Sequence, residues 1–575
     1  MSKTRDELDG LSLPEIQAKF ESMQKVTSVV TSAPKERELE ADANGECDFP
    51  TGDKGEFELE EIDSANETRA AHFNRRAFIQ GSTTIMTTVA VAGPLQSLMS
   101  RQARGDDGVI ASPYGTPVPA ADLETGLELL KLPPGFRYRS FGWTGDAMLD
   151  GNATPDKHDG MAVIGQYGPY AVLSRNHESG NGPAFAGGSI QYSPSAAGGC
   201  TTVLFNTWTG QFVTAFSALS GTIRNCAGGP TPWGTWLTCE ETTGTSEDGA
   251  VRHGYIFDVG VFGSNAQPLR DMGRFSHEAV AVDPRTSQVY ETEDAGDSSG
   301  FYCFTPRFPR FLGFGGKLQM AKVKGVDNFD FRTVPCDGRE YEIEWVDIEN
   351  PDPDLQGGED SCFEQGYAKG AAQFRRLEGI WYGNGKYYIV STNGGEDTPD
   401  SGSGEGIIFE YTPPRGFSGF PFGGEGRSRR RRRRRCGTLK VIYVSPAASV
   451  LENPDNIVVA PGGNGLLLCE DNSGGRFNDA ERLIGLTLDG QAFTFAENNI
   501  DFSESGLGSY TRRGSGITFD GNEKQSEWAG ATYSHNGEWM FVNIQTPGVT
   551  FAITGPWGAG PLGISRRGRF GRRGA

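Results

Sequence analysis

Residues 225–241, NCAGGPTPWGTWLTCEE, contain two short apolar segments on either side of a Gly/Pro turn, with polar side chains at both ends. This order predicts a β-hairpin whose open end carries Asn225 and Glu240. In four such hairpins the opening and closing polar residues are 15 positions apart, which indicates hairpins of nearly constant size. Five further stretches follow the same order: DGMAVIGQYGPYAVLSRNHE from Asp159, HEAVAVDPRTSQVYETED from His277, EGIWYGNGKYYIVSTNGGE from Glu378, DNIVVAPGGNGLLLCEDN from Asp455 and EWAGATYSHNGEWMFVNIQ from Glu527.

The recurrence of this hairpin predicts the architecture of the chain. A single hairpin cannot bury both of its faces, and radial stacking of four-stranded blades is the common solution when hairpins recur. The 81 glycines and 35 phenylalanines fit many short strands joined by tight turns. We therefore expect an all-β protein, a six-bladed β-propeller with long insertions. In such a fold the ends of all six hairpins converge on one axis.

Composition excludes several classes of function. The net charge of −21 argues against nucleic-acid specificity for the body of the chain. The nine cysteines are scattered singly without CxxC spacing, and the six histidines form no HExxH motif. A GxxxxGK[ST] motif is also missing. Carboxylates must therefore provide most of the ligands of any metal site.

The N-terminal part of the chain predicts an export signal. Arg75 and Arg76 precede a Thr/Ala-rich apolar run, the pattern of a twin-arginine signal. The run is too short for a permanent membrane span. We expect the twin-arginine translocation machinery to recognise this signal. We also expect the protein to be periplasmic or secreted. The expected segments are a polar, disordered extension over 1–73, the signal over 74–105, the propeller over 112–560 with an insertion at 305–375 and an Arg-rich loop at 415–437, and an Arg/Gly-rich tail over 561–575.

The polar ends of the hairpins predict a metal site. Acidic side chains such as Glu178, Glu241 and Asp471 directly follow apolar strands. Many carboxylates cannot crowd one funnel while all are charged, because like charges repel and raise one another's pKa. Cations would neutralise them, and calcium prefers six to eight oxygen ligands. The alternative is that many of these acids are solvated turn formers.

The same hairpins carry a family resemblance. NCAGGPTPWGTWLTCEE, RNHE, GRFSHEAVAVDP, RLEG and NPDNIVV followed by LLLCEDN appear in this order between about residues 130 and 556. Together they resemble the PhoX family of bacterial alkaline phosphatases. The resemblance implies a monomeric propeller that hydrolyses phosphomonoesters to release inorganic phosphate. It also implies a cofactor of two Fe³⁺ ions and several Ca²⁺ ions.

The resemblance also implies site residues. Arg376 in RLEG matches the phosphate-binding arginine, and we expect Arg376 and Glu378 to act in catalysis. Arg376 also follows a predicted helix over 363–375, so a role at the helix end is the alternative. Cys226 matches the cysteine ligand of iron, with Cys200 as the alternative. The expected metal ligands are Cys226, Glu240, Glu241, Glu291, Glu293, Glu378, Asp471, Glu178 and Asn176, without a division between iron and calcium.

Two other functions fit a propeller with acidic hairpin ends. One is a calcium-dependent lactonase or esterase, which predicts calcium and no thiolate-bound iron. The other is a non-catalytic, calcium-stabilised propeller that binds a partner on its face. Measurement of bound metals and of phosphatase activity distinguishes all three.

Overall fold

A computed structural model describes residues 8, 11–12, 14–20, 110–247, 249–398, 403–414, 436–471, 480–503 and 508–564. The twin-arginine segment, residues 415–435 of the Arg-rich loop and the tail from residue 565 lie outside these ranges. Within them, no helix is long and apolar enough to cross a membrane.

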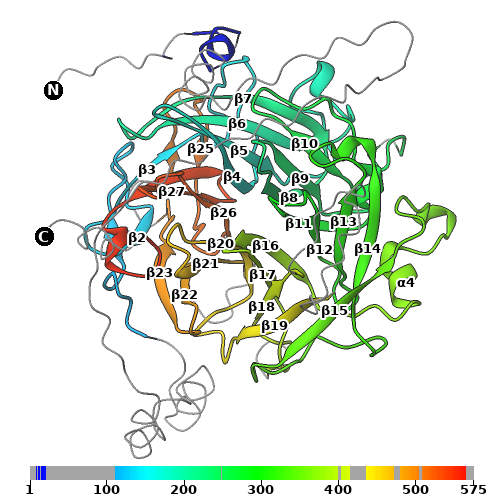
Figure 1. Ribbon diagram of the computed structural model, residues 1–575. Helices are drawn as coiled ribbons and strands as arrows, with labels where there is room; N and C mark the ends of the chain where they lie inside the picture. Colours follow the sequence, from blue (N-terminus) through cyan, green and yellow to red (C-terminus); the bar gives the residue numbers. More distant parts are fainter. Residues whose placement is uncertain are drawn as a thin grey trace, which may run out of the picture.

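Six inner strands form a closed ring around a central axis (Figure 1). Each contacts the next along the chain, and the last contacts the first. All six belong to the predicted hairpins. They are β4 (His158–Tyr167), β8 (Asn225–Pro230), β11 (His277–Val282), β16 (Leu377–Gly383), β20 (Pro454–Val459) and β26 (Trp528–Tyr533).

Antiparallel strands extend each inner strand outward. They are β5 (Tyr170–His177), β6 (Gly198–Asn206), β7 (Gln211–Thr222), β9 (Trp236–Glu240), β10 (Ile256–Val259), β12 (Val289–Glu293), β13 (Phe301–Pro306), β14 (Gly316–Val323), β17 (Lys386–Ser391), β18 (Ile407–Thr412), β19 (Gly437–Val444), β21 (Gly465–Glu470), β22 (Arg482–Thr487), β23 (Ala492–Asn498), β27 (Trp539–Ile544) and β28 (Val549–Thr554).

Short elements connect or complete the sheets. The remaining strands are β1 (Val118–Ala120), β2 (Leu130–Leu132), β3 (Arg137–Phe141), β15 (Glu340–Asp347), β24 (Tyr510–Thr511) and β25 (Thr518–Phe519). The helices are α4 (Cys362–Tyr367) and the 3-10 turns η1 (Gly188–Ile190), η2 (Arg270–Met272), η3 (Leu312–Phe314), η4 (Leu355–Gly357) and η5 (Trp557–Ala559).

The prediction of an all-β, propeller-like fold is confirmed, but the sheets are not six separate four-stranded blades. β15 pairs with both β14 and β19, so the sheets that begin at β11 and β16 merge into one nine-stranded sheet. The sheet that begins at β8 has only three strands. β3 pairs with β28 as the outer strand of the last sheet, which joins the start of the described propeller to its end.

Small residues let the inner strands approach closely. A Cβ atom on Gly160 would lie 2.5 Å from Cα of Ala227 on the next strand, and one on Gly379 would lie 2.7 Å from the carbonyl oxygen of Asp455. Apolar side chains fill the space between sheets farther out, including the buried Trp236 and Trp528. The inner strands therefore pack tightly enough to bring their polar ends together.

Part of the N-terminal extension differs from the expected disorder. Residues 14–20 are helical, and Leu8, Ile16 and Phe20 are buried. The Phe20 ring stacks on Tyr167 with centroids 4.5 Å apart. Ile16 and Phe20 are four positions apart, so a helix places both on one face. These two apolar residues lie within an otherwise polar segment.

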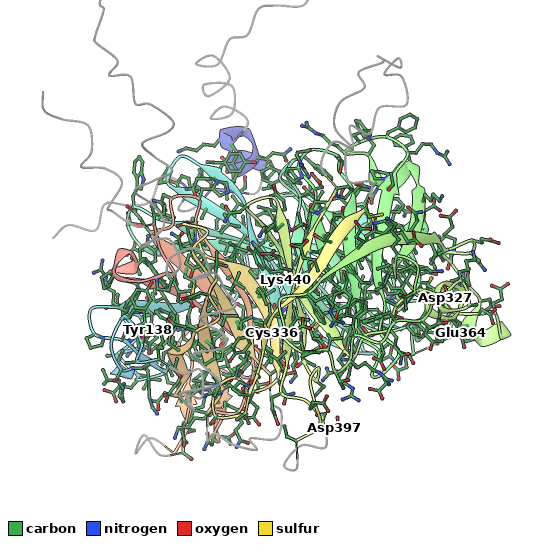
Figure 2. The ribbon with its side chains drawn as sticks, turned by 60° about the horizontal axis from the view of Figure 1, so that its bottom comes forward. Tyr138, Asp327, Cys336, Glu364, Asp397 and Lys440 are labelled. Carbon is green, nitrogen blue, oxygen red and sulfur yellow. The ribbon has the colours of Figure 1, made fainter. Side chains whose placement is uncertain are left out.

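The expected insertion at 305–375 contributes strands to the sheets as well as peripheral loops. It contains β14, β15 and α4. Figure 2 shows its residues Asp327 and Glu364 on the side of the ring opposite Tyr138 of β3. The helix predicted over 363–375 spans only Cys362–Tyr367, so Arg376 does not end a helix. Gly370, at φ +86°, follows in a backbone conformation that breaks a helix.

Candidate metal centre

The same irregularity interrupts all six inner strands. After the first pair of five hairpins, and after the second pair of the hairpin of β26, two residues of the inner strand face one residue of its partner, which is a β-bulge. Bulges redirect side chains and are common beside active sites. In five strands the first bulged residue carries a potential metal ligand: Asp159, Cys226, Glu278, Glu378 and Asp455. In β26 this position is Gly530.

A second set of acids follows the second strand of a hairpin. Glu178, Glu241, Asp294 and Asp471 come directly after β5, β9, β12 and β21. Glu527, just before β26, supplies an acid for the hairpin whose bulge carries glycine. The side chains of both sets point to the same end of the ring.

The two sets meet in one cluster of potential metal ligands. In four overlapping groups, one ligand atom from each residue lies within 4.8 Å of the others. Glu178, Asp455 and Glu527 each belong to two groups, which links the site. The groups are Glu178, Cys226 and Glu241; Asp159, Glu178 and Glu527; Glu278, Glu378 and Asp455; and Asp455, Asp471 and Glu527. We refer to these residues as the acidic cluster.

Burial and mutual repulsion make the acidic cluster a strong candidate for cation binding. Both carboxylate oxygens of Glu278, and Oδ1 of Asp455, are buried and accept no hydrogen bond in the described part of the chain. Burial, followed by the charge of Asp455, raises the pKa of Glu278 well above its usual range. Burial, followed by Asp159 and Glu278, likewise raises the pKa of the Cys226 thiol. Bound cations would reverse these shifts by stabilising the charged forms.

Two arginines border the acidic cluster. Nε of Arg224 donates to Oε1 of Glu178 at 3.1 Å, and its Nη2 pairs with Glu241. Arg376 forms a two-point contact with Asp294, with both donor distances 3.0 Å, and its Nη2 lies 2.8 Å from Oε1 of Glu378. Its Nη1 donates to Oδ1 of Asn393 at 3.2 Å. The Arg376 side chain keeps 38% of its surface exposed, so the N–H groups that remain free can reach a ligand at the mouth of the channel.

Three predicted ligands lie outside the acidic cluster, and two of them have other partners because of their place in the strand. Glu240 and Glu293 are the last residues of β9 and β12. Glu240 accepts hydrogen bonds from the backbone N–H groups of Ile223 and Gly254 and pairs with His253. Glu293 accepts from Tyr302 at 2.7 Å and from a backbone N–H group. Glu291, within β12, faces Nδ1 of His277 at 3.7 Å, but neither of its buried carboxylate oxygens accepts a hydrogen bond in the described part of the chain.

The remaining two predicted residues stabilise neighbouring strands. Nδ2 of Asn176 donates to the carbonyl oxygens of Cys226 and Ala227, and its Oδ1 accepts from Trp236. The Cys200 thiol also donates to Oδ1 of Asn176 at 3.0 Å, outside the acidic cluster. The acidic cluster therefore contains Cys226 but not Cys200, and it does not include the predicted ligands Glu240, Glu291, Glu293 and Asn176.

The acidic cluster includes four residues that the sequence-based ligand set lacked: Asp159, Glu278, Asp455 and Glu527. All four open a predicted hairpin or lie next to its first residue. They occupy the same place at the start of a hairpin as Cys226 and Glu378. This shared position is the sequence signal that could have identified them as candidate ligands. The five cluster members on bulges are each followed by a small residue or asparagine: Gly160, Ala227, Ala279, Gly379 and Asn456.

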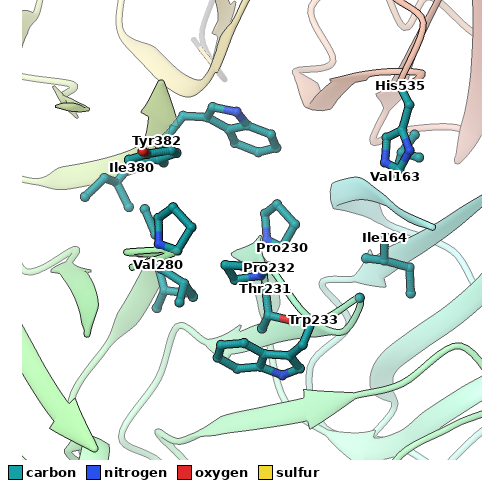
Figure 3. A pocket seen from close by; sticks show the side chains of 15 residues that line it. Val163, Ile164, Pro230, Thr231, Pro232, Trp233, Val280, Ile380, Tyr382 and His535 are labelled. Atoms are coloured by element: carbon teal, nitrogen blue, oxygen red, sulfur yellow. The ribbon is translucent and has the colours of Figure 1, made fainter. Parts of the chain in front are cut away.

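The opposite end of the channel is apolar. A cavity of about 580 Å³ lies there (Figure 3), and its lining includes Trp233, Trp381, Tyr382 and His535 but no acidic residue. Packed side chains such as Met161 and Trp236 leave a space of only about 10 Å³ between the two ends. The acidic cluster and the apolar cavity are therefore separate sites.

Comparisons with known proteins give one family. The model of the family "Alkaline phosphatase PhoX" matches residues 113–216 and 209–548. No curated protein matches the chain. Similar solved structures include a gluconolactonase from Xanthomonas campestris, at 12% identity and a TM-score of 0.29. This match covers 77% of the present chain and 98% of the gluconolactonase chain. The β-propeller domain of Myceliophteria thermophila Cps50 (Swd1) matches at 8% identity and a TM-score of 0.31, with 70% and 97% covered.

Proposed function

Since the chain belongs to the alkaline phosphatase PhoX family, we propose that it hydrolyses phosphomonoesters at the acidic cluster with an iron and calcium cofactor. The observation that carries the proposal is the convergence of five bulge residues and the strand-end acids on one buried site. A buried set of carboxylates with unpartnered oxygens fits cations better than any neutral ligand.

The donor set fits both proposed metals. Cys226 offers one sulfur ligand for iron, and the neighbouring carboxylates offer hard oxygen ligands. The groups around Asp455 and Glu527 contain only oxygen ligands, which calcium prefers. When bound, such metals polarise phosphoryl oxygens and lower the pKa of water.

Arg376 and Glu378 are the proposed catalytic residues at the mouth of the channel. The guanidinium of Arg376, a planar donor fork, would donate to phosphate oxygens through the N–H groups that its contacts with Asp294, Asn393 and Glu378 leave free. Asp294 holds that fork in place through two hydrogen bonds and is a positioning residue. Glu378 belongs to the acidic cluster and also contacts Arg376, so it would hold metal beside the bound phosphate.

The proposed reaction is hydrolysis of a phosphate ester. The oxygen of a water molecule forms a bond to phosphorus, and the bond between phosphorus and the ester oxygen breaks. The leaving alkoxide takes up the proton that the water loses, so the products are inorganic phosphate and an alcohol. Arg376 contributes by balancing negative charge on the phosphoryl oxygens in the transition state.

Three finer proposals accompany this function. We interpret the ring as a six-bladed propeller, supported by its six inner strands, in which β15 joins two blades. Arg75 and Arg76 support twin-arginine export to the periplasm or the medium. We also propose that the protein acts as a monomer, because the acidic cluster is assembled within one chain.

The test combines metal analysis with one pair of cysteine variants. The purified protein should contain iron and calcium and should release phosphate from p-nitrophenyl phosphate at alkaline pH. We expect Cys226→Ala to lose bound iron and at least about a hundredfold of kcat, because it removes the sulfur ligand. Cys200→Ala is the matched control, since Cys200 is also buried but lies outside the acidic cluster.

The outcomes separate the candidate functions. Calcium without iron, together with lactone hydrolysis and no phosphate release, would indicate a propeller lactonase. Calcium without any hydrolysis would indicate a binding module. Loss of iron in Cys200→Ala with normal iron in Cys226→Ala would contradict the assignment of the sulfur ligand.

A further inference from the structure

A second cavity opens beside the acidic cluster, at the same end of the channel. It has a volume of about 300 Å³. Its walls come from three segments: the residues before β4, those after β27, and those between β25 and β26. The lining residues that carry charge or reach the cluster are Asp156, Lys157, Asp520, Glu523 and Gln545.

Gln545 borders both the cavity and the acidic cluster. Its Nε2 donates to Oε2 of Glu178 at 2.8 Å and to Oε1 of Glu527 at 2.6 Å. Its Oε1 accepts a hydrogen bond from Nζ of Lys157 at 3.1 Å. Gln545 is therefore part of the cavity wall and also contacts the cluster, so the cavity lies directly beside the cluster.

Lys157 places an ammonium group at this boundary. It donates to Gln545 and to Oγ1 of Thr546 at 3.0 Å, and it forms no ion pair within the described part of the chain. Arg224 and Arg376, in contrast, are paired with acids of the site. The charge of Lys157 is thus available to an anion at the inner edge of the cavity.

The rest of the cavity carries the opposite charge. Asp156 and Asp520 are exposed and Glu523 is half-buried. Oδ1 of Asp156 accepts a hydrogen bond from Ser179. Burial raises the pKa of Glu523, Lys157 lowers it and Asp520 raises it, so these charges act on the same space. The cavity has a positive inner edge and a negative outer wall.

We propose that this cavity receives the alcohol part of the substrate and favours an alcohol that carries an ammonium group. The inference rests on the proposed phosphatase function and deepens it. The phosphate would lie at the acidic cluster, between Arg376 and Lys157, while the ammonium group would face Asp520 and Glu523. The preferred substrates are accordingly phosphomonoesters of amino alcohols.

Three esters of similar size and different charge test the proposal. They are phosphoethanolamine, 2-hydroxyethyl phosphate and phosphoglycolate, assayed with the metal-loaded protein at about 0.15 M salt to screen distant charges. We expect kcat/KM to fall from the ammonium to the hydroxyl to the carboxylate ester, by about tenfold overall. Equal values for the three esters would overturn the inference while leaving the phosphatase function intact. Phosphate release from none of them would overturn both.

Matched variants locate the effect. Glu523→Gln combined with Asp520→Asn should reduce the preference to about twofold, because both outer charges are lost. Lys157→Met should lower kcat/KM for all three esters by a similar factor, because the phosphate is common to them. Glu349→Gln, on an exposed acid of the insertion, should leave the preference unchanged. An unchanged preference in the double variant would also overturn the inference.

Discussion

At the scale of single residues, adjacent acids have different roles according to their place in a hairpin. Glu240, Glu293 and Glu470 each end a second strand and accept backbone hydrogen bonds. The acid that follows each of them faces the channel. The sequence predicted that acids would converge, but not which of two neighbours would face the axis. That choice depends on strand direction and on distant backbone partners such as Ile223 and Gly300, which local sequence does not specify.

Glu293→Gln tests this division between structural and ligand acids. Burial raises the pKa of Glu293 to about 7, so the folded protein favours its protonated form. The resulting destabilisation is absent below pH of about 4.5, grows with rising pH and is complete above about 7, reaching up to about 3 kcal/mol. A glutamine at this position can still accept the hydrogen bonds from Tyr302 and Gly300, but it does not ionise. We expect the thermal midpoint of the variant to fall less than that of the wild type between pH 5 and 8.

Metal content provides the second measurement for this variant. Glu293→Gln should retain all of its bound iron and calcium, because the acid lies outside the acidic cluster. Glu241→Gln is the matched comparison and should lose metal. A variant at Glu293 that loses metal would restore this residue to the ligand set.

At the scale of elements, the hairpins were predictable and the bulges were not. Alternating apolar runs and turn residues identified all six inner strands from the sequence. A bulge, however, is a feature of register, and its two residues have no fixed identity. The small second residue, such as Gly160 or Gly379, becomes informative only when the six hairpins are aligned on their bulges. The bulge explains why Asp455 and Cys226 reach the axis from equivalent positions.

Gly379→Ala tests the importance of the bulge. A Cβ atom at this position would lie 2.7 Å from the carbonyl oxygen of Asp455 and 3.0 Å from Cα of Asn456, so β16 and β20 would have to separate. We expect a loss of about 2–3 kcal/mol in stability and reduced metal content, because Glu378 and Asp455 share a ligand group. Thermal unfolding and metal analysis measure both effects.

Gly313→Ala is the control for this substitution. No atom lies within 4 Å of the Cβ that it would add, so its stability and metal content should match the wild type. If Gly379→Ala keeps a wild-type thermal midpoint, the inner strands tolerate more separation than their packing indicates.

At the scale of the whole molecule, closure of the ring was not predictable from the repeats. β3 precedes the first hairpin in the chain and has no hairpin partner of its own, yet it pairs with β28 over five residues from Arg137 to Phe141. Tyr138 fixes this strand, since its hydroxyl accepts from the backbone N–H of Leu129 at 2.8 Å and donates to the carbonyl oxygen of Ala120. Hairpin spacing indicates repeated units but carries no information about which distant strand completes the last one.

Two truncated chains test the role of closure. A chain that begins at residue 110 keeps β3 and should fold, bind metal and remain monomeric. A chain that begins at residue 142 lacks β3, so it leaves β28 as an open sheet edge and removes the buried side chains of Tyr138 and Phe141. Open edges promote association between chains. We therefore expect the shorter chain to aggregate in size-exclusion chromatography and to lose metal, because Asn543 of β27 contacts Asp159 across the closing contact of the ring. A monomeric, metal-loaded chain from residue 142 would show that the inner ring closes without its outer strand.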